Sequence, residues 1–200
     1  MTMWNERFAT PDYVFGTAPS RFLVEQEDHL PSGASALAIA DGEGRNSVFL
    51  AERGLHVTAM EAAPNAIAKA RKLAAARGVT VDFQEADIFD WDWAPGRFDR
   101  VVGVFFQFMG PEARAEVFEG MKRTTAPGGL VLIHGYTPEQ IAHGTGGPKD
   151  PENLYTEDLL REAFAGWEIL RLAAYEAVLD EGSGHAGRSA LIDLIARKPG

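Results

Sequence analysis

Short apolar runs alternate with helix-forming stretches along most of this 200-residue chain. Seven runs have the length and composition of strands: 34–40, 56–61, 79–84, 98–106, 129–135, 167–179 and 191–196. Helical patterns bounded by proline, glycine or a capping threonine lie between most of them. Such repetition predicts an α/β fold with a mostly parallel seven-stranded sheet and helices on both faces. The last two runs have no helix between them, so the last strand should be antiparallel.

Composition excludes several classes of protein. The net charge is −10 and the lysines and arginines are scattered, whereas binding to a nucleic-acid backbone needs a basic stripe. An acidic surface is also repelled by anionic membranes, and no apolar run is long enough to span one. Cysteine is absent and the five histidines are dispersed, so we expect no disulfide and no metal site.

The N-terminus lacks the pattern of a signal peptide. We therefore expect one cytoplasmic domain over 1–200, in which an aromatic-rich helical lid (1–31, with Thr17 as a helix cap) precedes a catalytic α/β core (32–200). The oligomeric state does not follow from the sequence.

A glycine-containing turn, Asp41-Gly42-Glu43-Gly44, ends the first apolar run, and a helix begins directly after it. Glycines let the backbone approach a ligand, and ligands of parallel sheets bind beyond the carboxyl ends of the strands. The second run ends in Glu61, 19 residues after Gly42, a spacing that suits a carboxylate accepting both hydroxyls of a ribose. The pair predicts a nucleoside-bearing cofactor, and the alternative is a tight turn beside a solvated acid.

A dinucleotide is not favoured. The dinucleotide fingerprint requires a third glycine where this chain has Ser47. The chain also ends in a strand pair instead of a second mononucleotide-binding half, which is unlike a nicotinamide dehydrogenase. A serine hydrolase is excluded because no serine lies in a G-x-S-x-G turn.

The stretches ALAIADGEGRN, HVTAMEAAP, EADIFD, FDRVV and APGG, with the terminal strand pair, resemble class I S-adenosylmethionine-dependent methyltransferases over essentially the whole chain. More narrowly, GEGRNSVFLAERGLHVTAMEAAP is similar to the small tellurite-resistance and thiopurine methyltransferases. The resemblance implies a Rossmann-like fold, S-adenosyl-L-methionine as cofactor, S-adenosyl-L-homocysteine as product and a small-molecule acceptor.

The same resemblance implies the cofactor contacts. Glu61 would bind the ribose, Asp87 the adenine amino group, and Val104 and Phe105 would lie near the methionine end. The full implied set is Asp41, Gly42, Glu43, Gly44, Asn46, Glu61, Ala62, Asp87, Ile88, Val104 and Phe105.

This chain departs from the family pattern at two positions of the first strand. The family has an acid and a glycine where this chain has Ala38 and Ala40. We therefore hypothesise that Asp41 or Glu43 supplies the missing charge.

His185 lies in the glycine-rich stretch DEGSGHAGRSA (180–190) between the last two strands. If the sixth strand is parallel to the first five, this tip lies at the cofactor edge of the sheet, together with the ends of strands four and five. The alternatives are a solvated histidine and aromatic residues that only cover the core. We predict His185, His134 and Tyr136 as catalytic residues. Predicted substrate contacts are Tyr13, Phe15, Phe106, Gln107 and Tyr155.

Methyl transfer is an in-line displacement at a sulfonium carbon, so the protein mainly aligns the reactants, and a base is needed only for a protonated nucleophile. The leading prediction is a thiol or a chalcogen oxyanion as acceptor. Two alternatives stay open. One is O- or N-methylation of a small metabolite with His134 or His185 as base, and the other is a domain that binds the cofactor without catalysis, which Ala38 and Ala40 would suit.

Overall fold

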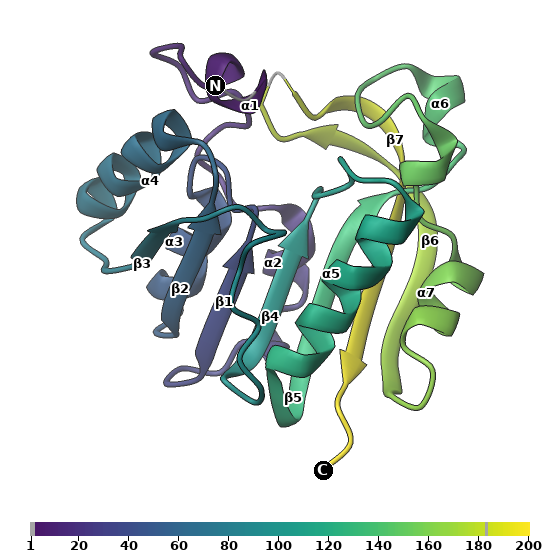
Figure 1. Cartoon of the computed structure of the whole chain (residues 1–200). Coiled ribbons are helices and arrows are strands. Elements are labelled where there is room, and N and C mark those ends of the chain that lie inside the picture. Colours follow the sequence, from purple (N-terminus) through teal and green to yellow (C-terminus); the bar gives the residue numbers. More distant parts are fainter. Residues whose placement is uncertain (1–2, 183) are drawn as a thin grey trace. The chain divides into compact units, whose positions relative to one another are not determined.

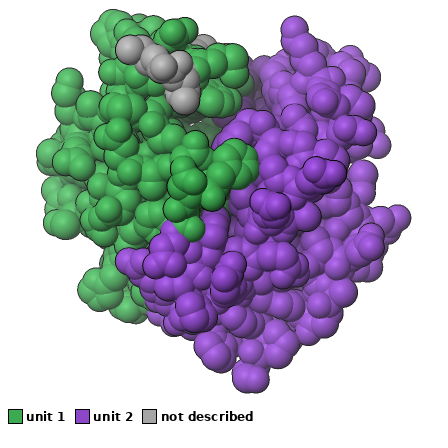
Figure 2. Space-filling model, in the orientation of Figure 1, with its two compact units in different colours: residues 1–91, 181–184 green, residues 92–180, 185–200 purple. Residues whose placement is uncertain are grey.

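The computed structural model describes residues 3–182 and 184–200 (Figure 1). These residues form two compact units (Figure 2). The first unit holds the chain up to Trp91 and the short segment 181–184, and the second holds 92–180 and 185–200. The chain therefore leaves the second unit at Glu181 and re-enters it at His185.

The first unit contains three parallel strands in the order β3-β2-β1. Helices α3 and α4 connect these strands and pack against them and against each other. The bounds are β1 Ser35–Ile39, α3 Arg45–Glu52, β2 His56–Glu61, α4 Pro64–Arg77 and β3 Asp82–Glu85.

The third strand begins three residues later than the apolar run predicted. Helix α4 ends at Arg77 and is capped by Gly78, which has a left-handed conformation. The Val79 amide then donates to the carbonyl of Ala74. Val79 also packs against Val48 and Leu73, so it completes the helix end instead of starting a strand.

The N-terminal region, which the sequence predicts to be a helical lid, contains three short helices, and its role as a lid stays a prediction. Its elements are α1 Met3–Arg7, α2 Arg21–Glu25 and the 3₁₀ helix η1 Glu27–His29. The predicted cap was wrong, because α2 begins after Ser20 and not after Thr17.

The second unit contains four strands in the order β4-β5-β7-β6. Strand β4 is parallel to β5, and β7 is antiparallel to both of its neighbours, so β6 runs parallel to β5. The bounds are β4 Phe98–Val104, α5 Pro111–Thr124, β5 Thr125–Tyr136, α6 Gln140–His143, η2 Pro151–Asn153, α7 Glu157–Ala163, β6 Glu168–Asp180 and β7 Ala186–Arg197. Thr156 caps α7 as predicted, since its hydroxyl accepts from the Leu159 amide.

The strands of the described residues thus make up the seven-stranded, mostly parallel sheet with an antiparallel last strand that the sequence predicted. The starts of β5 and β7 differ most from the prediction, and β4 ends at Val104 instead of residue 106. Strand β5 begins at Thr125, before the Pro-Gly-Gly segment, and β7 begins at Ala186 instead of Leu191. The β6–β7 connection is therefore only 181–185, because the backbone of 186–190 pairs with β6.

The core of the second unit lies along β5 and β7, where Leu132, Ile133, Leu194 and Ile195 are fully buried. Among the helices that the structure describes, none combines the length and the apolar character needed to cross a membrane.

Candidate active site

Glu61, at the end of β2, holds the glycine turn in place. Its Oε2 accepts from the Gly42 amide at 2.9 Å and its Oε1 from the Ala63 amide at 2.9 Å. Burial raises the pKa of the Glu61 carboxyl, and the backbone donors, including Ala62, offset part of that rise. Each carboxylate oxygen has a second lone pair, so Glu61 can anchor the turn and still accept from two hydroxyls.

Asp41 is the second acid of the turn, and its carboxylate binds Ser47 in the first turn of α3. Its Oδ2 accepts from the Ser47 hydroxyl at 2.5 Å and its Oδ1 from the Ser47 amide at 3.2 Å. Burial raises the pKa of Asp41 to about 6, the nearby charge of Glu61 adds to the rise, and Arg45 opposes it. Asp41 is therefore a partly buried acid whose pKa lies close to neutral pH, and a cation beside it would stabilise its charged form.

The two glycines of the turn differ. Gly42 has a φ of 64° and open space, since an added Cβ would meet only the edge of Phe8 at 3.8 Å. Gly44 has a φ of 88°, and an added Cβ would lie 2.8 Å from the Cα of Ala70 in α4. Gly42 is thus the position at which a ligand can approach the backbone, while Gly44 is required for the packing of α3 on α4.

A third acid, Asp87, follows β3 on the surface, and its charge also raises the pKa of Glu61. Asp87 Oδ1 accepts from the Phe89 amide at 3.0 Å, and Ile88 between them is buried. Three carboxylates therefore follow the ends of β1, β2 and β3 within the first unit.

These three carboxylates fit S-adenosylmethionine better than a dinucleotide. Carboxylates attract a cationic ligand with ribose hydroxyls and repel a pyrophosphate. The amides of Gly42 and Ser47, which a phosphate would need, already donate to Glu61 and Asp41.

Glu43 and Asn46 hold the N-terminal region. Glu43 Oε1 is 2.7 Å from Lys69 Nζ in a buried ion pair, and its Oε2 accepts from the Phe15 amide at 3.2 Å. Asn46 Oδ1 accepts from the Ser20 amide at 2.9 Å. Because Glu43 is paired with Lys69, Asp41 is the better source of the charge that Ala38 does not provide. Direct cofactor contact by Glu43 and Asn46 stays a prediction.

In the second unit, an aromatic cluster surrounds Phe105, the residue after β4. Phe105 has a φ of 54°, which is rare for a bulky side chain and typical of functional sites. Its ring stacks on His185 at 4.1 Å between centroids and lies 4.7 Å from both Tyr136 and His134. Val104, beside it, pairs with His134 in the β4–β5 ladder.

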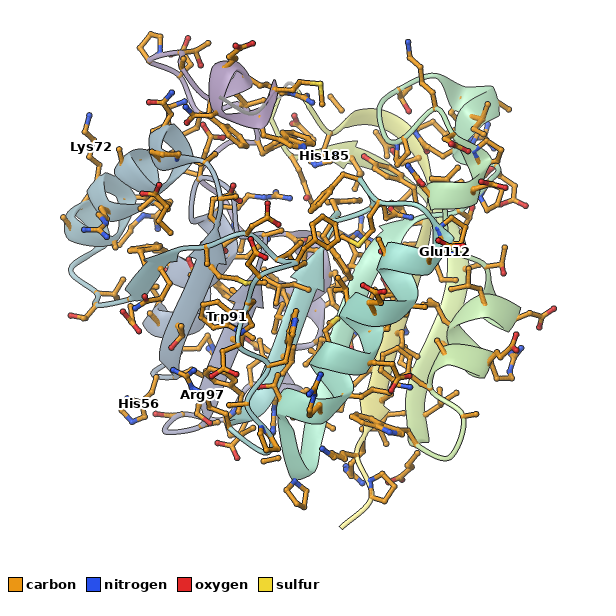
Figure 3. The ribbon with its side chains drawn as sticks, viewed as in Figure 1. His56, Lys72, Trp91, Arg97, Glu112 and His185 are labelled. Atoms are coloured by element: carbon orange, nitrogen blue, oxygen red, sulfur yellow. The ribbon has the colours of Figure 1, made fainter. Side chains whose placement is uncertain are left out.

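His185 is not solvated, which was the alternative to a catalytic role. It is buried, with 8% of its surface exposed, and its Nδ1 lies 2.6 Å from the Tyr136 hydroxyl. The His185 side chain is labelled in Figure 3. The tip is shorter than expected, so His185 directly precedes β7 and is covered by Phe105 and Tyr136. A histidine fixed in this way can transfer a proton in a set direction.

His134 is fixed by a different partner. Its Nδ1 lies 2.7 Å from Asp193 Oδ1, directly across the β5–β7 pair. Asp193 also accepts from Arg171 at 2.8 Å and from the Tyr175 hydroxyl at 3.2 Å. The carboxylate thus sets the orientation of the His134 ring, as an orienting acid does in a catalytic pair.

The predicted substrate contacts have structural partners. Gln107 is buried and pairs with both backbone groups of Tyr136. Phe106 and Tyr155 are buried and pack edge-on against each other and against Phe118. These positions suit the core of the second unit, and their contact with a substrate stays a prediction.

The two predicted substrate contacts in the first unit are only partly buried. Tyr13 donates to the Lys69 carbonyl, and the Phe15 ring lies near those of Trp4 and Phe8. Contact of either residue with a substrate likewise stays a prediction.

Sequence reasoning missed a buried ion pair between Arg45 and Glu181, whose Nη1 and Oε2 atoms lie 2.8 Å apart. No spacing rule links two residues so far apart in the chain. The one sequence feature that the two residues share is a neighbouring glycine: Arg45 follows Gly44 in the turn, and Glu181 precedes Gly182 after β6.

Comparisons with known proteins agree with this geometry. Residues 36–129 match the family model described as a methyltransferase domain. A 2-heptyl-1-hydroxyquinolin-4(1H)-one methyltransferase of Mycobacteroides abscessus is 36% identical over 94 residues, which are 46% of this chain and 41% of that protein. The chain thus matches less than half the length of this curated relative.

Solved structures share the fold. TehB from Haemophilus influenzae has a TM-score of 0.70 at 24% identity over 88% of this chain and 61% of that one. A structure from work on the conversion of a disulfide bond into a thioacetal group during echinomycin biosynthesis has a TM-score of 0.75 at 22% identity, over 96% of this chain and 85% of that one. Others are described as S-adenosylmethionine-dependent methyltransferases.

Residues 36–129 are therefore similar to a methyltransferase domain, and the described chain has the fold of solved S-adenosylmethionine-dependent methyltransferases.

Proposed function

We propose that this chain methylates a small molecule with S-adenosylmethionine as the methyl donor, and that the acceptor atom is a thiol sulfur. When bound, the cofactor supplies an electrophilic methyl group on a sulfonium. Glu61 would accept from the ribose hydroxyls, Asp87 from the adenine amino group, and Asp41 would face the ammonium group. The carboxylates after β1, β2 and β3 support this assignment, because their charges suit a cationic nucleoside.

The contact between His185 Nδ1 and the Tyr136 hydroxyl is the observation that carries the assignment of the acceptor. With its proton on Nδ1, the imidazole donates to Tyr136, and Nε2 keeps a lone pair that can take a proton from the acceptor. A thiol gives up its proton near neutral pH and becomes a strong nucleophile as the thiolate. His185 would therefore activate the acceptor, and Tyr136 would hold the ring in place.

An acidic hydroxyl is the second candidate. The same histidine could take its proton, and the relative from M. abscessus is named for a hydroxyquinolone substrate. A chalcogen oxyanion, the other acceptor that the sequence predicts, arrives already ionised, so it would leave His185 without a proton to remove. Location in the cytoplasm and the absence of a nucleic-acid partner belong to the same proposal and rest on composition alone.

The test combines calorimetry with an acceptor screen. S-adenosylhomocysteine should bind, and a panel of small thiols, hydroxy-aromatics, amines and tellurite should show turnover first among the thiols. His185→Gln should lower kcat by about 100-fold or more, the usual contribution of a general base, without changing the affinity for S-adenosylhomocysteine. Activity should recover at a pH at which the acceptor is already ionised.

Three results would overturn parts of the proposal. Failure to bind S-adenosylhomocysteine would remove the cofactor assignment. Binding without turnover of any acceptor would favour a domain that binds the cofactor without catalysis. Equal rates for His185→Gln and the parent protein would reject His185 as a general base. The acceptor would then be one that needs no deprotonation.

A further inference from the structure

We propose that Arg45 and Glu181 are positioning residues, whose buried ion pair holds the hairpin tip in place and thereby sets the position of His185. The hairpin tip is defined here as Glu181, Gly182 and Gly184, in the β6–β7 connection. This inference rests on the proposed role of His185 in methyl transfer. Neither residue is part of the predicted cofactor or substrate contacts.

The ion pair is buried on both sides, with 6% of the Arg45 side chain and 9% of the Glu181 side chain exposed. Glu181 is fixed at both carboxylate oxygens, because Oε2 lies 2.8 Å from Arg45 Nη1 and Oε1 accepts from the Arg21 amide at 2.9 Å. The two atoms are close enough for an ion pair but are not aligned for a hydrogen bond, so the attraction is between the two charges. The loss of one charge would leave the other buried and uncompensated.

The tip also interlocks with a segment that we call the N-terminal strap, residues 12–16. The Gly184 amide donates to the Val14 carbonyl at 3.2 Å. A Cβ on Gly182 would lie 2.5 Å from the Gly16 nitrogen, and a Cβ on Gly184 would lie 2.2 Å from the Phe15 ring. Both tip glycines are therefore required by close contact with the strap, which answers why the sequence places glycines on each side of this turn.

The strap in turn is anchored to α3 and α4. Lys69 Nζ donates to the Asp12 carbonyl at 2.6 Å, and the Tyr13 hydroxyl donates to the Lys69 carbonyl at 3.0 Å. Glu43 accepts from the Phe15 amide and pairs with Lys69. The polar residues that follow Gly42 thus organise the strap and the tip: Glu43 holds the strap and Arg45 holds the tip.

The fixed position of the tip restricts His185 because the two are adjacent in the chain. Gly184 is joined to His185 by a single peptide bond, and Glu181 is joined in the same way to the last residue of β6. Glycine has more backbone freedom than any other residue, so a tip that contains Gly182 and Gly184 would be poorly ordered by itself. The Arg45–Glu181 pair supplies the order that the glycines lack.

The test compares Glu181→Gln with the parent protein by two independent measurements. Hydrogen–deuterium exchange without any ligand should increase in peptides that cover 12–16 and 181–188, where the Gly184 amide is protected. In turnover, the kcat/KM for the acceptor should fall by about tenfold or more through kcat, because His185 is misplaced, while the affinity for S-adenosylhomocysteine changes less than about twofold.

Two further variants keep the result interpretable. In Arg45→Gln/Glu181→Gln both charges are removed, so no unpaired charge is buried and the fold should persist by circular dichroism, while exchange at the tip stays raised. Glu25→Gln breaks the exposed Arg21–Glu25 pair in the same region, and it should leave exchange and turnover unchanged.

Unchanged exchange and turnover in Glu181→Gln would overturn the proposal. A parallel loss of S-adenosylhomocysteine affinity and turnover would also overturn it, because the pair would then support the cofactor turn instead of the tip. If the parent protein bound no S-adenosylhomocysteine, the proposed function would fail, whereas the exchange result would still show whether the pair orders the tip.

Discussion

Each unit has one residue with an unusual backbone just after a strand, and the two residues differ. Ala40 follows β1 with a φ of 46°, and Phe105 follows β4 with a φ of 54°; they are the only described non-glycine residues with a positive φ. Beyond Ala40 the chain enters a turn of carboxylates and glycines. Around Phe105 lie the rings of His134, Tyr136 and His185.

In the proposed function the two units would contribute different chemistry. Partly buried acids with raised pKa values would stabilise a cation and accept from hydroxyls, as a sulfonium nucleoside requires. Aromatic rings that hold two histidines offer an apolar surface and a proton acceptor, which suits a small acceptor molecule. The backbone strain at Phe105 is compensated by the contacts of its ring. The methyl side chain of Ala40 can make few contacts, so it compensates little of the strain there.

The largest effect expected from this division concerns Glu61. Glu61→Leu should raise the dissociation constant of S-adenosylhomocysteine by about 100-fold or more, because hydrogen bonds to a charged group contribute about 1.5–3 kcal/mol each. Unfolding should also become easier, since the Gly42 and Ala63 amides lose their acceptor. Calorimetry and thermal unfolding measure the two effects.

Glu85→Leu is the matched control for Glu61. Glu85 ends β3, lies beside Glu61 in the β2–β3 ladder and is exposed. It should therefore leave the cofactor affinity within about twofold. Equal losses for both variants would mean that the overall negative charge matters, and the specific role of Glu61 would be lost.

Asp41→Asn should have a smaller effect on affinity and an opposite effect on stability. Without the carboxylate facing the ammonium, the dissociation constant of S-adenosylhomocysteine should rise about tenfold at pH 8. The free protein should become more stable at pH 7 by about 2–3 kcal/mol, because the buried acid no longer has to ionise. Denaturant unfolding at pH 4.5 and pH 7.5 measures this change.

The direction of the pH dependence follows from the raised pKa of Asp41. Folded Asp41 has a pKa of about 6, above the value of an unfolded aspartate, so the folded protein binds the extra proton between about pH 4 and pH 6. The contribution to stability is present at low pH and is lost as pH rises through about 6. Cofactor affinity should run the opposite way and fall below pH 6, and Asp41→Asn should remove both dependences.

Glu43→Gln separates the two acids of the turn. Because Glu43 is already paired with Lys69, the pH dependence of cofactor affinity should persist in this variant. Unchanged affinity in both Asp41→Asn and Glu43→Gln would reject the idea that either acid replaces the one missing at Ala38.

The fold could be predicted from the sequence because it depends on patterns that are local. The apolar runs, the helix caps at Gly78 and Thr156, and the missing helix between the last two strands fixed the element order and the antiparallel end. The errors lie at strand ends such as Val79 and Ala186, where a capping bond or a backbone ladder determines the boundary instead of hydrophobicity.

From the sequence, candidate site residues could be assigned only where they lie at or just after a strand end. The turn at Gly42, the acid Glu61 and the exposed Asp87 are at such positions. The partners of Glu43, Asn46 and His185 could not be found, because they depend on contacts between segments far apart in the chain. A charged residue in a glycine turn can face a ligand or another loop, and the sequence is the same in both cases.

Substitution of Ala40 should have the smallest effect on stability, and it tests the comparison between the strained residues Ala40 and Phe105 most directly. In the left-handed region an alanine costs about 1 kcal/mol or more relative to glycine, and a glycine loses about 0.4–1 kcal/mol through the greater freedom of the unfolded chain. Ala40→Gly should therefore stabilise the protein by at most about 1 kcal/mol in denaturant unfolding, with turnover unchanged.

Substitution of Phe105 by glycine should change the free energy of unfolding in the opposite direction. Phe105→Gly relieves the backbone equally but removes the ring that stacks on His185 and Tyr136, so the protein should lose about 2–3 kcal/mol of stability. If both variants were stabilised, the ring contacts would not compensate the strain at Phe105. The two units would then share one kind of strained turn, and the distinction between a charged and an aromatic site would rest on side chains alone.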